Sequence, residues 1–280
     1  MIATTPNEPK QHAGELVTEP PNLEQHVLGT YFDVRLGIAV MGFSLPILLA
    51  LIGKLLGIPL QGSMSAYYHA VAGGIPTCQA AVAIGSGTLR NLFVGVLTAV
   101  GVSLYVYKGF SQSENVALNL AGIALATVAF VPMAWPECSG GGWISMHGGA
   151  ALFFFLCIAY VSVFRAMDTV SLIKSKERAR RYGITYRWLG VAMIVSPVLA
   201  VLWNALFTPA GDHSSQIFFI EAFGVFAFAG YWLAKSFELK ETSAEAAALK
   251  GKLVRVKRRE GGRPDDAELI HLDTITPQAH

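Results

Sequence analysis

Long, almost uncharged apolar runs are the feature that most constrains what this chain can fold into. A helix rises about 1.5 Å per residue and the hydrocarbon core of a bilayer is roughly 30 Å thick, so about 20 apolar residues cross it. Runs close to this length cover about 36–56, 92–107, 116–134, 147–164, 188–207 and 217–234. They predict an all-α fold, a polytopic transmembrane helix bundle of about six spans.

Composition and backbone chemistry favour the same fold class. Charged residues make up 14% of the chain and hydrophobic residues 53%, whereas soluble domains carry about 25% charged residues. In lipid every backbone amide must be paired within the protein, which only helices and closed barrels achieve. Barrel strands alternate apolar and polar residues over about 10 positions, and these runs do not alternate. Gly42, Gly95, Gly101 and Gly122 fall inside the runs and are expected to let helices approach closely.

The chain divides into three regions by composition. Residues 1–34 are polar and rich in proline and glutamate, so we expect a disordered cytoplasmic N-terminal tail. Residues 35–236 hold the six-span transmembrane domain. Residues 237–280 form a basic cytoplasmic tail, with a helix-forming stretch over about 241–254 followed by an end rich in Gly and Pro that we expect to be disordered.

The distribution of Lys and Arg predicts the orientation of the bundle. Positive residues of short loops favour the cytoplasmic side of a membrane. The connection 168–186 and the C-terminal tail are basic, whereas 135–146 and 208–216 contain no Lys or Arg. This pattern places both termini in the cytoplasm and the connection between the first two spans outside.

The basic clusters indicate one class of partner and argue against another. They comprise Lys174, Lys176, Arg178, Arg180 and Arg181 in the connection, and Lys257, Arg258 and Arg259 in the tail. Either cluster can bind anionic lipid headgroups, at about 1 kcal/mol per residue, or represent only the ordinary cytoplasmic excess of positive charge. Because no aromatic residues are interleaved with them, they do not indicate nucleic-acid binding. The lipid bilayer is the expected partner, and the sequence indicates no oligomeric state.

With this orientation, several histidines and carboxylates fall at the outer membrane surface. They are His69, His147, His213, Asp212 and Glu221. Imidazole and carboxylate are ordinary zinc ligands, and a catalytic zinc keeps three protein ligands and a water, whose pKa it lowers to about 7. One hypothesis is a zinc site with His69, His147, His213 and Asp212 as ligands. The alternative is a set of interfacial polar residues in hydrated loops, without a metal.

Ser65 and Glu221 are the candidate catalytic residues. Ser65 precedes His69 by four positions, which puts both on one face if the segment is helical. A carboxylate inside a membrane span is costly, so Glu221 is expected to face a partner or a cavity. Its candidate partners are Arg90, Lys54 and His213.

The three cysteines fall into two groups. Cys78 and Cys138 lie in connections that are expected outside, where an oxidising compartment would allow a disulfide between them. Such a bond closes a loop of about 60 residues and contributes on the order of 4 kcal/mol if it is unstrained. Cys157 lies inside a span and is expected to be a small packing residue.

Several segments carry a resemblance to a family. They are Ser-Ala-Tyr-Tyr-His at 65–69, Arg-Asn-Leu-Phe-Val-Gly-Val-Leu at 90–97, Leu-Tyr-Val-Tyr-Lys-Gly at 104–109, Asn-Leu-Ala-Gly at 119–122 and the span that begins at His147. The chain resembles, over roughly 30–235, a class of uncharacterised bacterial multi-span membrane proteins with a domain of unknown function. Asn91 departs from the aspartate usual in that family. The resemblance implies the span layout and a bacterial cytoplasmic (inner) membrane, and it implies no activity.

Ser65 and His69 are also similar to a motif of a second group, the membrane hydrolases that include alkaline ceramidases and adiponectin-receptor-like proteins. These carry a Ser-x-x-x-His pair, an acidic residue and a later His pair around a zinc, to which His147 or His213 would correspond. The chain departs from this pattern, with six expected spans rather than seven and no His-x-x-x-His pair in the last. The resemblance implies a metal-dependent membrane hydrolase acting on a lipid or envelope substrate.

The function expected from the residues themselves is less specific. It is an integral membrane protein of unresolved activity with a pocket lined by histidine and carboxylate at its outer face. Besides the hydrolase, the alternatives that remain open are a small-ligand transporter and a sensor without enzymatic activity.

Overall fold

The computed structural model describes residues 22–70, 87–133, 145–207, 215–257 and 267–272, and within these it has six helices long and apolar enough to cross a membrane. They are α1 (Leu23–Leu55), α2 (Thr88–Val106), α3 (Gln112–Phe130), α4 (Met146–Tyr160, extended through α5), α6 (Lys176–Phe207) and α7 (Gln216–Thr242). The fourth span continues from α4 through a π-helical segment, Val161–Arg165, into α5 (Met167–Val170). The predicted all-α bundle of six spans is therefore confirmed.

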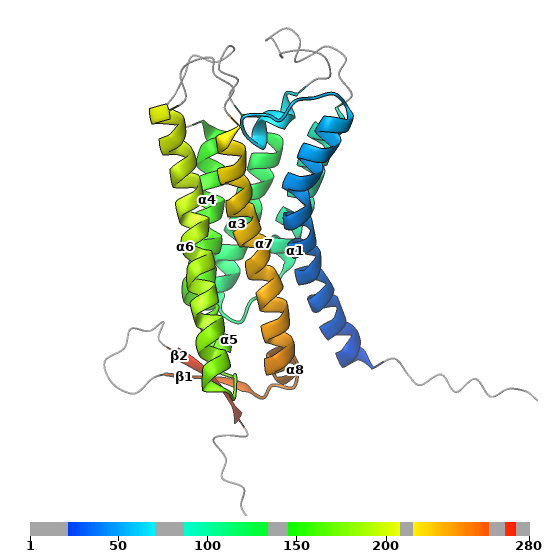
Figure 1. Ribbon diagram of the computed structural model, residues 1–280. Coiled ribbons are helices and arrows are strands. Elements are labelled where there is room, and N and C mark those ends of the chain that lie inside the picture. The colour runs from blue at the N-terminus through cyan, green and yellow to red at the C-terminus, as the bar shows by residue number, and fades with distance from the viewer. Residues whose placement is uncertain (1–21, 71–86, 134–144, 208–214, 258–266, 273–280) are drawn as a thin grey trace, which may run out of the picture.

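The six helices form a closed ring. Neighbours in the ring are α1 and α2, α2 and α3, α3 and α4, α4 and α6, α6 and α7, and finally α7 and α1 (Figure 1). Glycine lets two of these pairs approach closely: a Cβ on Gly42 of α1 would lie 3.0 Å from Ala229 of α7, and one on Gly101 of α2 would lie 3.0 Å from the backbone oxygen of Gly122 in α3. The expectation for Gly95 is not met, because nothing lies within 4 Å of its Cβ position.

The outer surface of the ring is apolar, as a helix bundle in lipid requires. The face of α6 that points away from the other helices exposes Val195, Val198 and Leu202 by more than two fifths of their surface. A continuous apolar surface of this size is unusual on a soluble protein. It agrees with an integral membrane protein that crosses the bilayer several times.

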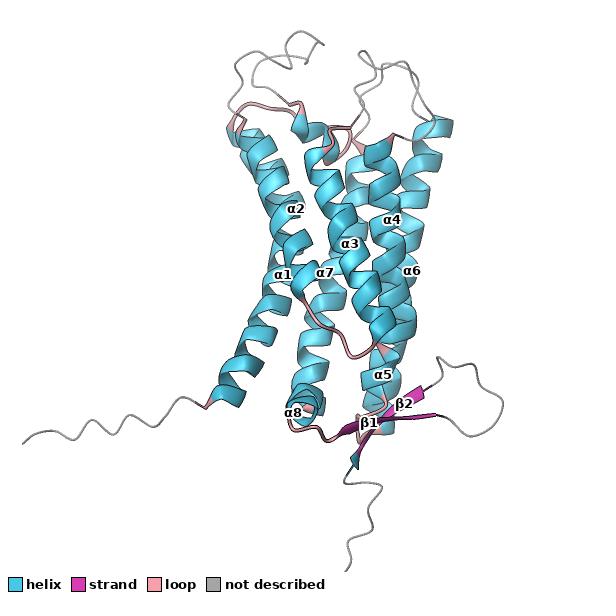
Figure 2. Ribbon diagram, turned by 180° about the vertical axis from the view of Figure 1, so that it is seen from behind, coloured by secondary structure: helices cyan, strands magenta, loops and turns pink. Residues whose placement is uncertain are grey.

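The two ends of the bundle carry different elements, as Figures 1 and 2 show. One end carries the short 3-10 helix η1 (Ser65–Tyr68) and the first turns of α2, α4 and α7, and we call it the η1 end. The other carries the first turns of α1 and α6, together with α8 (Ala244–Leu249), β1 (Leu253–Lys257) and β2 (Ala267–His271), and we call it the tail end. The first and last described residues both lie at the tail end.

The boundaries of the two predicted tails differ from the structure. The helix α1 begins at Leu23, where the side chain of Asn22 accepts a hydrogen bond of 3.1 Å from the Glu24 N–H, so the expected disordered tail is wrong for residues 23–34. Residues 1–21 lie outside the described residues. An N-cap side chain pairs with an otherwise unpaired amide of the first helical turn. A prediction from the length of apolar runs does not use this signal.

The predicted helix over 241–254 is also only partly correct. α7 runs to Thr242, Ser243 adopts a left-handed conformation with φ of 50°, and α8 begins directly afterwards. β1 and β2 then pair antiparallel, with Leu253 opposite His271. The prediction of disorder after the helix is therefore wrong for these two strands, while 258–266 and 273–280 lie outside the described residues.

Candidate functional site

The segment that contains η1 is fastened across the end of the bundle by α7. The Phe218 N–H donates to the Gly62 carbonyl at 2.8 Å, and the Met64 N–H donates to Oε2 of Glu221 at 2.7 Å. Glu221 therefore holds a backbone amide of the connection, and neither Arg90 nor Lys54, while His213 lies outside the described residues and stays a predicted partner. Arg90 instead donates from Nε to the Tyr68 carbonyl at 3.2 Å.

Tyr67 anchors the same segment in the bundle. Its ring is 1% exposed, and a Cβ on Gly53 of α1 would lie 3.0 Å from the ring edge. Burial raises the pKa of the Tyr67 hydroxyl above its ordinary value. Tyr67 therefore remains neutral around pH 7 and positions its neighbour Ser65 by packing.

Ser65 and His147 form a hydrogen-bonded pair at the η1 end. Nε2 of His147 lies 2.8 Å from Oγ of Ser65, and Nδ1 lies 2.7 Å from the Val131 carbonyl oxygen. A carbonyl oxygen only accepts, so Nδ1 carries the proton and Nε2 is left to accept the Ser65 hydroxyl. His147 is 5% exposed. This arrangement has the parts of a nucleophile and its general base, with the base oriented by a third group.

The described residues alone do not assemble a zinc site. Both ring nitrogens of His147 are hydrogen-bonded as above, and Nε2 of His69 lies 3.1 Å from the Met133 carbonyl oxygen. Among the residues that the structure describes, no group of three or more His, Cys, Asp or Glu side chains is arranged to hold a metal. Asp212 and His213, the other expected ligands, lie outside the described residues, so their part in the metal hypothesis stays a prediction.

The cysteine predictions have two outcomes. Cys78 and Cys138 both lie outside the described residues, so the disulfide stays a prediction. Cys157 is a free thiol buried in α4, as its position in an apolar span indicates.

A cavity of about 180 Å³ opens below Ser65, inside the ring of helices. All six spanning helices line it, and its apolar wall includes Leu45, Val100, Leu125, Phe154, Phe155 and Phe228. The polar side chains in its lining are Ser65, Ser196 and Glu221. Ser196 donates to the Ile220 carbonyl at 2.6 Å, and Ser65 and Glu221 are the polar side chains of the lining that lie at the η1 end.

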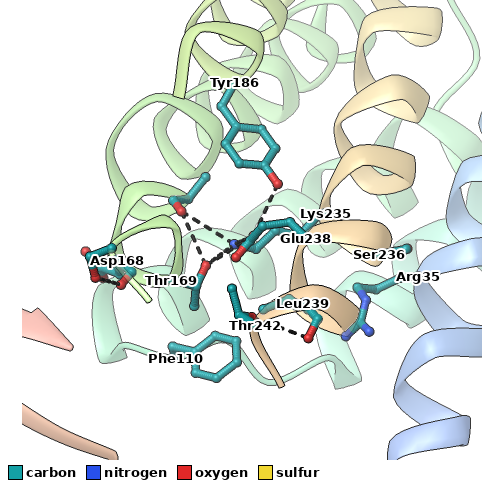
Figure 3. A network of polar contacts seen from close by, with 12 residues as sticks. Arg35, Phe110, Asp168, Thr169, Tyr186, Lys235, Ser236, Glu238, Leu239 and Thr242 are labelled. Carbon is teal, nitrogen blue, oxygen red and sulfur yellow. Dashed lines mark hydrogen bonds and ion pairs between the residues drawn. The ribbon is translucent and has the colours of Figure 1, made fainter. Parts of the chain in front are cut away.

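A second polar cluster is buried at the tail end, and sequence reasoning missed it (Figure 3). Lys235 and Glu238 of α7 are 2% and 0% exposed, and their Nζ and Oε2 atoms lie 2.6 Å apart. The Tyr186 hydroxyl of α6 donates to the same carboxylate oxygen at 3.2 Å, and Lys235 also donates to Oγ1 of Thr169 in α5. These bonds join α5, α6 and α7 at the tail end of the ring.

A related pair joins α3 to the end of the fourth span. Arg165 donates from Nη2 to Asp168 at 2.9 Å and from Nη1 to Ser113 at 3.1 Å. Nearby, the carboxylate of Glu114, which is 3% exposed, accepts the Phe110 N–H at 2.8 Å. The described helices therefore carry Glu114 and Glu238 besides Glu221. The prediction from apolar runs placed Glu238 in the tail. The apolar residues that continue through Leu239 were the signal that α7 extends further.

Comparison of this chain with protein-family models, with curated proteins and with solved structures finds no match. The two resemblances described from its motifs therefore stay predictions. The function has to be argued from the cavity and the residues at its η1 end.

Proposed function

We propose that this membrane protein binds an amphipathic, lipid-like molecule, with an apolar chain in the cavity and the polar end of the ligand at Ser65 and Glu221. We further propose that it resides in a bacterial cytoplasmic membrane with its tail end in the cytoplasm, so that the polar end of the ligand faces the extracytoplasmic side. The basic connection before α6 supports this orientation.

The distribution of polarity within the cavity is the observation that carries the proposal. An apolar protein cavity of about 150 Å³ stays dry and binds apolar molecules such as benzene, and this one is of similar size, about 180 Å³. Water is therefore a poor occupant and a hydrocarbon chain a good one. Ser65 and Glu221 both come from the η1 end, so a ligand with one polar end binds in one direction only.

The binding proposal is tested by counting lipids that the purified protein retains, using native mass spectrometry. Ala151 lines the cavity, and Ala151→Phe fills it. Ala99→Phe, on the exposed face of α2, adds the same volume outside. We expect wild type and Ala99→Phe to retain a lipid that Ala151→Phe loses. Equal retention by all three proteins would contradict the proposal.

The Ser65–His147 pair supports a second candidate function, acyl transfer from an ester of the bound lipid. Ser65 Oγ would attack the ester carbonyl while Nε2 of His147 takes the hydroxyl proton. His147 then returns that proton to the leaving alcohol as the ester C–O bond breaks, and water releases the acyl group from Ser65. The hydrogen bond of 2.8 Å between the two side chains favours this candidate over a purely structural serine.

A fluorophosphonate probe, which reacts with activated serines, separates the two candidates. Acyl transfer requires labelling of the wild type that Ser65→Ala abolishes, that His147→Asn reduces and that a metal chelator does not change. Ser103→Ala, on a lipid-facing position of α2 whose hydroxyl bonds only the Ala99 carbonyl at 2.8 Å, is the matched control and keeps full labelling. A wild type without labelling excludes acyl transfer by Ser65 and leaves lipid binding intact.

A further inference from the structure

A second cleft lies at the tail end, between the first turns of α1 and the last turns of α7. Figures 1 and 2 both show α1 diverging from α7 here, with α8 at the base of the gap. The cleft is lined by Leu28, Phe32 and Arg35 of α1, by Lys240 of α7, and by Ser243 and Glu245 at the start of α8. It therefore combines an apolar wall with two cations from different helices.

The position of Arg35 along α1 matches the depth of lipid headgroups. Arg35 precedes the last residue of α1, Leu55, by 20 positions, which corresponds to roughly 30 Å of helix, the thickness of the hydrocarbon core. Because α1 ends at the opposite membrane surface, Arg35 reaches the surface on the tail side. Leu28 and Phe32 flank it within the same cleft.

Arg35 is unusual because its guanidinium is buried and incompletely paired. It is 1% exposed; both Nη atoms contact the carboxylate of Glu245, and Nη1 also donates to the Tyr107 hydroxyl at 3.3 Å. Nε has no hydrogen-bond partner among the residues that the structure describes. A buried, unpaired N–H is costly, and the planar fork of an arginine fits the oxygens of a phosphate as well as those of a carboxylate.

Apart from its ion pair with Arg35, in which its side chain is 15% exposed, Glu245 is held in place by the short helix that carries it. It belongs to the short helix α8, which follows the left-handed residue Ser243 and spans Ala244–Leu249. The far end of α8 is joined to α1 by an ion pair of 3.0 Å between Lys250 and Glu24, whose side chains are 53% and 32% exposed. Such exposed pairs contribute little, whereas Ala244 and Ala247 of α8 are buried. Release of Glu245 from Arg35 therefore requires a shift of this short helix, and not of the six-helix ring.

We propose that this cleft binds the phosphate of an anionic phospholipid from the leaflet on the tail side, and that Glu245 occupies the phosphate position on Arg35 when no lipid is bound. The lipid phosphate replaces the Glu245 carboxylate on the two Nη atoms and gains Lys240 as a second cation. The acyl chain lies against Leu28 and Phe32. This site is separate from the cavity at the η1 end and from the basic clusters seen in the sequence.

The test measures the affinity for phosphatidylglycerol of the full chain in phosphatidylcholine nanodiscs, by native mass spectrometry. Glu245→Gln removes the competing carboxylate charge and should raise the affinity about five-fold, and Lys240→Gln should lower it about five-fold, since one cation near a headgroup contributes about this factor. Arg187→Gln removes an exposed cation of α6 that belongs neither to the cleft nor to the basic clusters and should change nothing. Lys240 is exposed, so its variant is expected to fold normally.

Two results would overturn the proposal. The first is an affinity for phosphatidylglycerol that neither Glu245→Gln nor Lys240→Gln changes. The second is displacement of the bound lipid by millimolar inorganic phosphate, which would assign the site to a soluble phosphate and not to a lipid. Neither result bears on the η1-end cavity, so the two proposals can fail separately.

Discussion

Lys235 and Glu238 pose the clearest energetic question at the scale of single residues. Two charges taken out of water lose several kcal/mol of solvation each, and their attraction offsets this loss only when the remaining hydrogen bonds are satisfied. Here Thr169 and Tyr186 supply such bonds, although Oε1 of Glu238 has no partner. The loss of solvation of each charged side chain is therefore offset only while the other is present.

This dependence leads to the first expectation. Lys235→Met leaves the Glu238 carboxylate buried without its cation, and we expect a loss of about 3–5 kcal/mol in the free energy of unfolding. The double variant Lys235→Met with Glu238→Leu removes both charges and should lose less than half of that. Denaturation of the detergent-solubilised protein by sodium dodecyl sulfate measures both. A double variant as unstable as the single one would contradict the coupling.

Ser243 offers a second test at a single residue. Its φ of 50° lies in the left-handed region, where a β-branched side chain is strained and glycine is not. Ser243→Gly should preserve or raise the stability of the tail end by up to about 1 kcal/mol, whereas Ser243→Val should lower it by about 1–3 kcal/mol. Hydrogen exchange of α8 reports the change locally. Faster exchange in Ser243→Gly than in Ser243→Val would rule out this reading of the turn.

At this scale the sequence indicated candidate residue types but not their hydrogen-bond partners. Ser65, His147 and Glu221 were each named as site residues, yet the bond between Ser65 and His147 joins positions 82 residues apart. Spacing along a helix cannot reveal such a contact. Likewise, the partner of Glu221 is a backbone N–H. Almost every residue has one, so the identity of the side chains cannot indicate which N–H is bound.

The helix pair α2 and α3 shows what decides packing at the scale of elements. A Cβ on Gly122 would lie 2.5 Å from the Gly101 carbonyl oxygen and 3.2 Å from Cβ of Tyr105, whereas Gly95 of α2 has nothing within 4 Å. We expect Gly122→Ala to lower the free energy of unfolding by about 1–3 kcal/mol because the two helices must separate. The matched control Gly95→Ala should be neutral, or stabilising by up to about 1 kcal/mol. Equal effects at both glycines would contradict the close approach.

The elements themselves were largely predictable because hydrocarbon length is a strict physical requirement. All six predicted spans coincide with helices, and the errors lie at their ends. α1 and α7 extend beyond the predicted apolar runs at the tail end, where polar residues such as Glu24 and Glu238 lie within the helices without ending them. Hydropathy identifies segments that are apolar enough to lie in hydrocarbon. It does not identify helical turns that continue past the apolar run or that bury ion pairs.

The orientation of the bundle is a question for the whole molecule. The η1 end and the tail end carry the groups that we propose to face opposite compartments. In a variant without the native cysteines, Gln61→Cys should react with a membrane-impermeant maleimide in intact cells, because Gln61 lies at the η1 end. Arg181→Cys, exposed near the start of α6, should react only after the membrane is permeabilised. The reverse pattern would invert the orientation and place the Ser65–His147 pair in the cytoplasm.

The proposed function requires an apolar chain to enter the ring of helices from the membrane. A fatty acid carrying a diazirine near its methyl end tests this directly, because irradiation attaches it to whatever it contacts and peptide mass spectrometry locates the adducts. We expect adducts on cavity-lining residues such as Leu125 and Phe155, which Ala151→Phe removes. Adducts confined to outward-facing residues such as Val198 and Leu202 would show a chain that stays in the bilayer, and would contradict the claim.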